Sequence, residues 1–293
     1  MANGIIIIDK PQGWTSMDVC AKLRGMFQER RVGHAGTLDP MATGILPVFL
    51  GRATRAVEFT EGYDKEYVAS LRLGVVTNTQ DTTGEILEEH PVRAGRRELE
   101  AVLEQLRGDI LQVPPMYSAI KVNGKKLYEL ARKGREVERK PRPVTISALE
   151  LLGQEGNGDW KLRVECSKGT YIRTLCHDIG QALGCGGTMS ALRRTRVGPF
   201  VGGVSLEQVQ QEADQGRAQA MLTGVEGCFA HLPIAEAAAR ERDKFILNGA
   251  AYPCRLTPGR YRVRGPEGEF LMVGEVKDGK MTTVKSFFEV DRS

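Results

Sequence analysis

Alternating apolar and polar positions predict several β-strands in the first two thirds of the chain. The alternation is clear in residues 65–74 and again in residues 160–166, as expected for strands with one buried face. An aliphatic run over residues 3–9 ends in a Lys-Pro-Gln-Gly sequence at 10–13, which predicts a strand followed by a turn. We therefore expect a sheet built from segments that lie far apart in the sequence.

Apolar residues at helical spacing predict three amphipathic helices between these strands. Thr15 and Asp18 form a capping-box pattern, and apolar residues then recur at helical spacing as far as Phe27. The same spacing occurs in residues 99–106 and 172–183. Because strands and helices do not alternate regularly, the mixture predicts an α+β fold rather than a doubly wound sheet.

The C-terminal part of the chain has a different pattern. A helix-like stretch over residues 234–247 is followed by three expected strands at 261–264, 270–276 and 281–287, with Asp278-Gly279 as a hairpin turn. A module of roughly fifty residues needs support from the main domain or from a partner. We expect a main domain over residues 1–232 and a small β-rich domain over residues 233–293.

The composition places the chain among ordinary globular proteins. It has 293 residues, of which 41% are hydrophobic and 27% are charged, which excludes a disordered chain, a collagen-like fibre and a membrane bundle. The longest aliphatic run, residues 5–8, is too short to cross a bilayer, and no export signal is visible. Six widely spaced cysteines without a C-x-x-C pattern are typical of reduced thiols, so we expect a cytoplasmic protein.

The positive charge of the chain is concentrated in residues 121–143. This segment has nine basic and three acidic residues, a net charge of +6, whereas the whole chain carries +4. Such a concentration indicates contact with a polyanion such as a nucleic acid. The alternative is a solvated basic loop that keeps the protein soluble.

The most unusual motif is Gly-His-Ala-Gly-Thr-Leu-Asp-Pro-Met-Ala-Thr-Gly at residues 33–44, which places one carboxylate, that of Asp39, among glycines. Pro40 favours an extended backbone at Asp39, and glycines allow a ligand or another segment to approach closely. An Asp-Pro turn between two core elements is the alternative interpretation. The motif lacks the Gly-Lys-Ser/Thr of a phosphate-binding loop and the pattern of a zinc deaminase.

This motif resembles the catalytic motif of the TruB family, the bacterial tRNA pseudouridine-55 synthases. Six further segments resemble the family in the same order, at residues 9–13, 65–67, 112–119, 121–132, 166–173 and 192–194. The resemblance covers roughly residues 3–200, and the C-terminal strands resemble the family's PUA-type RNA-binding domain. It implies the pseudouridine synthase fold, in which helices and loops flank a mixed, largely antiparallel central sheet, followed by a β-rich PUA-type domain.

The resemblance also implies a function. A TruB-family enzyme isomerises one uridine in the T-loop of tRNA to pseudouridine, and this reaction requires no metal or other cofactor because it involves neither oxidation nor phosphate transfer. The implied partner is the T-arm stem-loop of tRNA, without a membrane or a protein partner, and the expected state is a monomer. The alternatives are a non-catalytic tRNA-binding or folding protein and a synthase that acts on another RNA.

The family assigns catalytic roles to three residues of this sequence. Asp39 corresponds to the nucleophile, and Arg173 to the arginine that pairs with it. Burial disfavours a charged carboxylate, so a cation must oppose that effect if Asp39 acts in a water-excluded cavity. Tyr67 corresponds to a tyrosine that stacks on the uracil and is a candidate to remove the proton from C5. Whether Asp39 first attacks the sugar, attacks the ring or abstracts a proton stays open.

Four further residues correspond to substrate-binding positions of the family. Tyr171 would help to hold the uracil, and Leu192 would close the pocket beside it. The target base must leave its stack, and His34 would offset that cost by stacking inside the RNA loop. Lys10 would either contact phosphate or support the Asp39 loop.

The basic segment has a family counterpart in a mobile loop that closes over the RNA. Its glycines and scarcity of large apolar residues suggest that it orders on binding. Arg193, Arg194 and Arg196 are expected to extend its basic surface.

Overall fold

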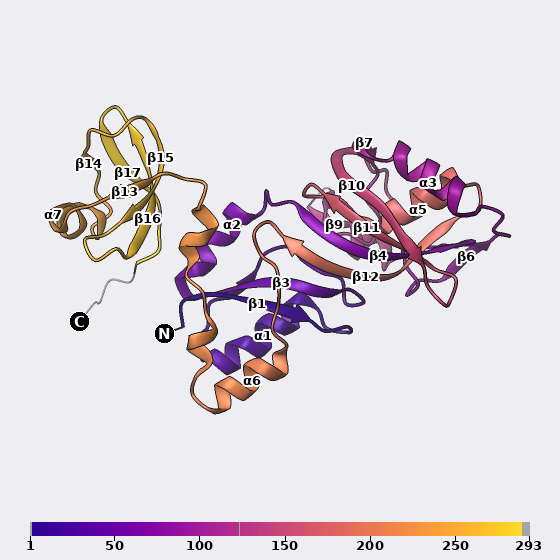
Figure 1. The fold of residues 1–293 in the computed structure, drawn as a ribbon, viewed down its shortest axis with the longest axis horizontal. Coiled ribbons are helices and arrows are strands. Elements are labelled where there is room, and N and C mark those ends of the chain that lie inside the picture. The colour runs from indigo at the N-terminus through magenta and orange to yellow at the C-terminus, as the bar shows by residue number, and fades with distance from the viewer. Residues whose placement is uncertain (1, 123, 289–293) are drawn as a thin grey trace.

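The computed structural model describes residues 2–122 and 124–288. The molecule is elongated, with a small β-module at one end and a large sheet that runs from the middle to the other end (Figure 1). No helix within these described ranges is both long enough and apolar enough to span a bilayer.

The central sheet has eight strands and brings together segments from most of the chain. Its order is β1-β3-β12-β4-β11-β10-β7, with β2 paired to β3. Only the β12–β3 pair among these is parallel, so the expected mixed, largely antiparallel sheet is confirmed. The strands are β1 (Gly4–Lys10), β2 (Val32–His34), β3 (Thr43–Leu50), β4 (Lys65–Leu73), β7 (Gly108–Gln112), β10 (Arg142–Gln154), β11 (Trp160–Cys166) and β12 (Gly187–Val197).

Two groups of helices cover this sheet and form two cores. Helices α1 (Ser16–Phe27) and α6 (Leu206–Asp214) pack on β1 and β3, whereas α3 (Arg96–Gln105) and α5 (Ile172–Ala182) pack on the half that contains β4 and β10 (Figure 1). The predicted capping box is present, because Thr15 Oγ1 accepts from the Asp18 N–H at 3.0 Å and an Asp18 carboxylate oxygen accepts from the Thr15 N–H at 2.9 Å. Helices α1, α3 and α5 confirm the three helices expected from apolar spacing.

Short elements connect the main ones. The helical segments are Gly51–Ala56, α2 (Val57–Thr60), α4 (Leu127–Ala131), Ala218–Met221 and Val225–Phe229, and the two small hairpins are β5 (Val75–Thr77) with β6 (Ile86–Glu89) and β8 (Lys121–Val122) with β9 (Lys125–Lys126).

The C-terminal module is a five-stranded sheet of order β13-β15-β16-β17-β14. The Asp278-Gly279 hairpin turn is confirmed, with φ values of 51° and 70° that match a type I′ turn. The strands and helical turns are β13 (Ile234–Glu236), α7 (Ala239–Glu241), a π-helical turn (Arg242–Ile246), β14 (Tyr252–Pro253), β15 (Gly259–Arg264), β16 (Phe270–Lys277) and β17 (Lys280–Ser286).

The helix expected over residues 234–247 is wrong in its first part. Ile234–Glu236 is a strand that pairs in parallel with residues 262–264 of β15, and it buries Ala235 while Ile234 and Glu236 stay exposed. Hydrogen bonding to the edge of β15 outweighs the helical preference of this alanine-rich segment, as tertiary pairing commonly does.

Aromatic side chains join the C-terminal module to the larger part of the molecule. Phe229 is 1% exposed, and its ring lies 5.1 Å from that of Phe59 on α2 and 5.4 Å from that of Phe287. Arg55 donates to the Ser286 carbonyl oxygen at 3.1 Å. The small sheet therefore shares a hydrophobic core with the main sheet, as its size requires.

Candidate active site

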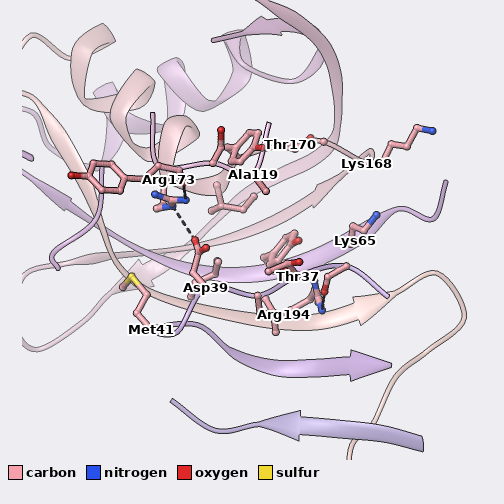
Figure 2. A pocket seen from close by; sticks show the side chains of 18 of the residues that line it. Thr37, Asp39, Met41, Lys65, Ala119, Lys168, Thr170, Arg173 and Arg194 are labelled. Carbon is pink, nitrogen blue, oxygen red and sulfur yellow. Dashed lines mark hydrogen bonds and ion pairs between the residues drawn. The ribbon is translucent and has the colours of Figure 1, made fainter. Parts of the chain in front are cut away.

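A cavity of about 970 Å³ lies where β4, β12 and the start of α5 meet. Its walls include residues 34–41, 117–119 and 167–173. Figure 2 shows Asp39 pointing into this cavity toward Arg173. The seven site residues predicted from the sequence can now be placed relative to it.

The loop that carries Asp39 is held at both ends. The Leu38 N–H donates to Ser16 Oγ at 2.9 Å, and the Pro40 carbonyl accepts from the Gly13 N–H at 2.8 Å. Gly44 follows the loop with a φ of 101°, and a Cβ atom there would lie 2.1 Å from the Arg194 carbonyl oxygen. Glycine is required at this position because the two backbones touch.

Asp39 and Arg173 form the predicted ion pair. The Arg173 Nε atom lies 3.0 Å from Asp39 Oδ2. The guanidinium is also fixed by two backbone carbonyls, since Nη1 donates to Thr79 at 3.0 Å and Nη2 donates to Tyr117 at 2.8 Å. A cation held on several sides presents a defined charge to the carboxylate.

The expectation of a water-excluded Asp39 carboxylate is wrong for this structure. The Asp39 side chain is 41% exposed, whereas that of Arg173 is 7% exposed. The arginine emerges from the core and the aspartate lies at the cavity surface, so any exclusion of water from the carboxylate has to come from a bound substrate.

A second carboxylate, missed in the sequence analysis, also faces Arg173. Asp81 Oδ2 lies 3.8 Å from Arg173 Nε, and Asp81 is 5% exposed. Its Oδ1 accepts hydrogen bonds from Thr79 Oγ1 at 2.8 Å and from the Thr83 N–H at 2.9 Å. The only sequence signal is a polar Asn-Thr-Gln-Asp-Thr-Thr run at residues 78–83, which is equally typical of a turn.

Tyr67 and Leu192 lie on neighbouring strands and line the cavity. Tyr67 is 8% exposed and Leu192 is 9% exposed. Burial raises the pKa of Tyr67 above its ordinary value. Both residues thus line the same cavity as Asp39. Their contact with a uracil stays a prediction.

Tyr171 lies just before α5 and is held by its backbone. The Gln112 side chain accepts from the Tyr171 N–H at 2.8 Å and donates to the Tyr171 carbonyl at 3.1 Å. Burial raises the pKa of the Tyr171 phenol. Gln112, which is 2% exposed, is a second residue that sequence reasoning did not identify as supporting the site.

Comparison of the sequence with protein-family profiles assigns the chain to a family. The profile described as "TruB family pseudouridylate synthase (N terminal domain)" matches residues 24–172, and that described as "tRNA pseudouridylate synthase B C-terminal domain" matches residues 173–230. The chain belongs to the TruB family of pseudouridylate synthases. The first match contains Asp39 and Tyr67, and the second begins at Arg173.

Individual relatives agree with this assignment over nearly the whole chain. The tRNA pseudouridine synthase B of Stutzerimonas stutzeri is 45% identical, with 95% of this chain and 93% of the relative covered. That of Francisella philomiragia is 42% identical, with 99% and 96% covered.

Solved structures confirm the pseudouridine synthase fold of this TruB-family chain. A structure of an H/ACA RNP bound to a substrate RNA containing 2'-deoxyuridine has a TM-score of 0.73 at 26% identity, with 98% of this chain and 86% of that chain covered. A Cbf5-Nop10-Gar1 complex has a TM-score of 0.73 at 28% identity, with 98% and 85% covered.

His34 lies at the end of β2 in the wall of the TruB-family cavity. Burial lowers its pKa, and the positive charge of Arg194 acts in the same direction, so the imidazole is neutral near neutral pH. Its buried Nδ1 atom has no hydrogen-bond partner in the described part of the chain. A buried polar atom of this kind has capacity for a ligand.

Of the two interpretations of Lys10, the structure favours the one in which Lys10 holds the Asp39 loop in place. Lys10 is 0% exposed, and its Nζ donates to the carbonyls of Trp14 at 2.6 Å, Pro11 at 2.9 Å and Pro40 at 3.4 Å. Burial lowers the pKa of Lys10 from 10.5 to about 8. The predicted substrate contact is therefore corrected, since all three N–H donors of Lys10 bind backbone carbonyls, one of them that of Pro40 next to Asp39.

The expected basic surface formed by Arg193, Arg194 and Arg196 is also wrong. Arg193 Nη2 pairs with Asp9 at 2.7 Å, and Arg196 pairs with Glu165. Arg194 is 1% exposed. Two of these charges are neutralised and the third is inside the protein, so none of them extends the basic segment.

The basic segment itself borders the cavity. It contains β8, β9 and α4, and Leu127 anchors it with 1% exposure, while Tyr128 and Arg132 line the cavity wall. Of its nine cations, Arg139 alone has an ion-pair partner within the described residues, Glu136 at 2.8 Å. The segment therefore presents largely unneutralised positive charge beside Asp39. That it orders on RNA binding stays a prediction.

Proposed function

We propose that this protein converts one uridine in the T-loop of tRNA to pseudouridine. The observation that carries the proposal is the Asp39–Arg173 ion pair, because it sets a charged carboxylate at the surface of a cavity that is large enough for a nucleoside. The TruB-family relatives named tRNA pseudouridine synthase B support tRNA as the substrate.

The reaction makes three demands on the site. The N-glycosidic bond of uridine must break, the uracil must turn while it is held, and C5 must bond to the same ribose. Asp39 is the proposed nucleophile, with Arg173 stabilising its negative charge. Tyr67 is the proposed group that takes the proton from C5 after the new bond has formed.

The remaining cavity residues have proposed roles in holding the RNA. Tyr67, Tyr171 and Leu192 would surround the uracil once it has left its stack. The free Nδ1 atom and neutral ring of His34 suit a position inside the T-loop, where stacking offsets the cost of extrusion. The RNA would then cover Asp39 and exclude water from the carboxylate.

RNA contacts outside the cavity follow from charge and from domain structure. The unneutralised cations of residues 121–143 suit phosphate contacts. We assign residues 1–232 to a catalytic domain and residues 233–293 to a PUA-like RNA-binding domain that contacts tRNA away from the reaction. We further propose a cytoplasmic monomer that needs no protein partner, with the T-arm stem-loop sufficient as substrate.

The test is to incubate the purified protein with a tRNA transcript and to map carbodiimide-reactive pseudouridine. We expect a single modified position in the T-loop, and none with the Asp39→Asn variant, which should still bind the transcript. Binding without modification by the wild-type protein would indicate a non-catalytic tRNA-binding protein. Modification only of a different RNA would contradict the proposed substrate.

A further inference from the structure

Arg194 is a buried cation directly beneath the cavity. It lies on β12 and is 1% exposed. Among the described residues it is the largest side chain that is fully buried. Within residues 2–122 and 124–288, no carboxylate lies at ion-pair distance from it. A buried charge without a counter-charge is costly, so its presence calls for a compensating role.

The hydrogen bonds of Arg194 connect it to the loop of Asp39. Its Nε donates to the Ile45 carbonyl at 2.8 Å, and Nη2 donates to the Gly36 carbonyl at 2.9 Å. Nη1 lies 3.5 Å from the Thr37 carbonyl. Figure 2 shows Arg194 beside Thr37, at a different part of the cavity wall from Arg173. A guanidinium has five N–H donors, so two remain for another acceptor.

Tyr67 is the neighbour of Arg194 on the adjacent strand. Arg194 and Tyr67 are directly opposite each other in the antiparallel β12–β4 pair, so their side chains leave the sheet on the same face. The positive charge of the guanidinium therefore lies near the Tyr67 phenol and favours its ionised form. Both side chains are buried, so little solvent screens this interaction.

Four influences act on the ionisation of Tyr67. Burial, the thiol of Cys166 and the carboxylate of Asp39 raise its pKa, whereas Arg194 lowers it. Arg194 also lowers the pKa values of Lys10, His34 and Lys65, because it places positive charge near all three. Arg194 therefore opposes the other influences on Tyr67.

We propose that Arg194 is a positioning residue for the isomerisation, in which it orients Tyr67 against the Asp39 loop and stabilises the Tyr67 phenolate. The inference rests on the proposed function. A phenolate oxygen can accept the proton that leaves C5. The C5–H electron pair then forms the C5–C6 double bond, the C6–N1 π pair moves to N1, and N1 takes a proton from water. The Tyr67 phenol finally loses its proton to solvent.

The first test measures Tyr67 without any RNA. The ultraviolet absorbance of tyrosinate is followed against pH in the full-length protein, and the step that is absent from Tyr67→Phe is assigned to Tyr67. In Arg194→Gln or Arg194→Met this step should move at least one pH unit higher, and Arg194→Lys should restore much of the shift. The two neutral replacements are compared because one keeps a hydrogen-bonding group and the other suits an apolar interior.

The matched control is Arg193→Gln, which removes the same charge one residue away on β12. Arg193 faces Asp9 rather than Tyr67, so the Tyr67 step should stay where it is in the wild-type protein. A Tyr67 step that moves equally in both variants, or in neither, would overturn the inference.

The second test measures the single-turnover rate on tRNA against pH. Arg194→Gln should be at least about tenfold slower than the wild-type protein at neutral pH, since one pKa unit is a tenfold change in phenolate. The difference should narrow as the pH rises toward the ionisation of Tyr67. A loss by one constant factor at every pH would indicate a purely structural role. If the wild-type protein forms no pseudouridine, the proposed function is wrong. If the wild-type protein is active but the Tyr67 ionisation step of Arg194→Gln lies at the wild-type pH, only this inference is wrong.

Discussion

Arg173 is almost fully buried, yet its partner Asp39, at 3.0 Å, keeps 41% of its side chain exposed. The positive member of the pair is thus fixed by the protein interior, and the negative member is presented at the cavity surface. This asymmetry suits a carboxylate that must meet an incoming substrate while its charge stays compensated.

Asp81 should support catalysis through Arg173. The Asp81→Asn variant keeps the size of the side chain but removes the second negative charge 3.8 Å from Nε. We expect the single-turnover rate to fall by about 10- to 100-fold, the range that small misplacements of catalytic groups produce, with tRNA affinity changed by less than about twofold. Rapid-quench kinetics with a filter-binding assay would measure both. An equal loss of rate and affinity would show that Asp81 acts on RNA binding instead.

Lys10 should make the stability of the protein depend on pH. Its pKa is lowered in the folded protein to about 8 from the ordinary 10.5, so between these values the unfolded chain binds more protons than the folded one. The contribution of Lys10 to stability therefore rises with pH from about 8 to 10.5. Urea unfolding of the wild type and of Lys10→Met at several pH values would measure it. A difference between the two proteins that is constant across this window would contradict the expectation.

The unpaired cations of the basic segment should determine the salt dependence of RNA binding. Replacing Lys133, Arg135 and Lys140 by glutamine should weaken tRNA binding and reduce the slope of log affinity against log salt by about 2, since each phosphate contact contributes roughly 0.7 to 0.9. The rate at saturating RNA should stay unchanged. Arg193→Gln is a control, because Asp9 already neutralises that charge and the slope should not move.

His34 should matter most for a folded T-loop. His34→Ala should lower the rate on a structured tRNA by about tenfold, within the roughly 1–3 kcal/mol that a stacked ring contributes. Because burial lowers the pKa of His34, the ratio of the two rates should be flat between pH 7 and 8. A short unstructured RNA that contains the same uridine should show little difference. Equal losses on both RNAs would place the effect of His34 outside base extrusion.

Much of the fold could be predicted from local pattern. Alternation and helical spacing depend on a few neighbouring residues, and they identified β4, β11, α1 and α5 correctly. The exception at residues 234–236 arises because the partner strand begins 25 residues later, at Gly259. Short-range preference carries no information about such pairing.

The candidate site could be predicted as far as its motif extends. Asp39, Tyr67 and Arg173 belong to recognisable segments, and the structure brings them to one cavity. Asp81 could not be found in this way, because it lies in none of these segments. Gln112 opens one of them, but nothing in the sequence shows that its side chain binds the Tyr171 backbone. Lys10 was assigned by resemblance, with support of the Asp39 loop as the alternative, and Arg194 was assigned to a basic surface. The burial of both depends on the complete sheet, which local pattern does not show.

The aromatic contact between Phe229 and Phe287 has a consequence for substrate length. Because the C-terminal sheet shares a core with the main sheet, its separation from Asp39 is set by the protein and not by a flexible tether. An RNA that touches both ends would have to match that separation. A tRNA whose helical arm is lengthened by a few base pairs should therefore lose one of the two contacts while its T-loop sequence stays intact.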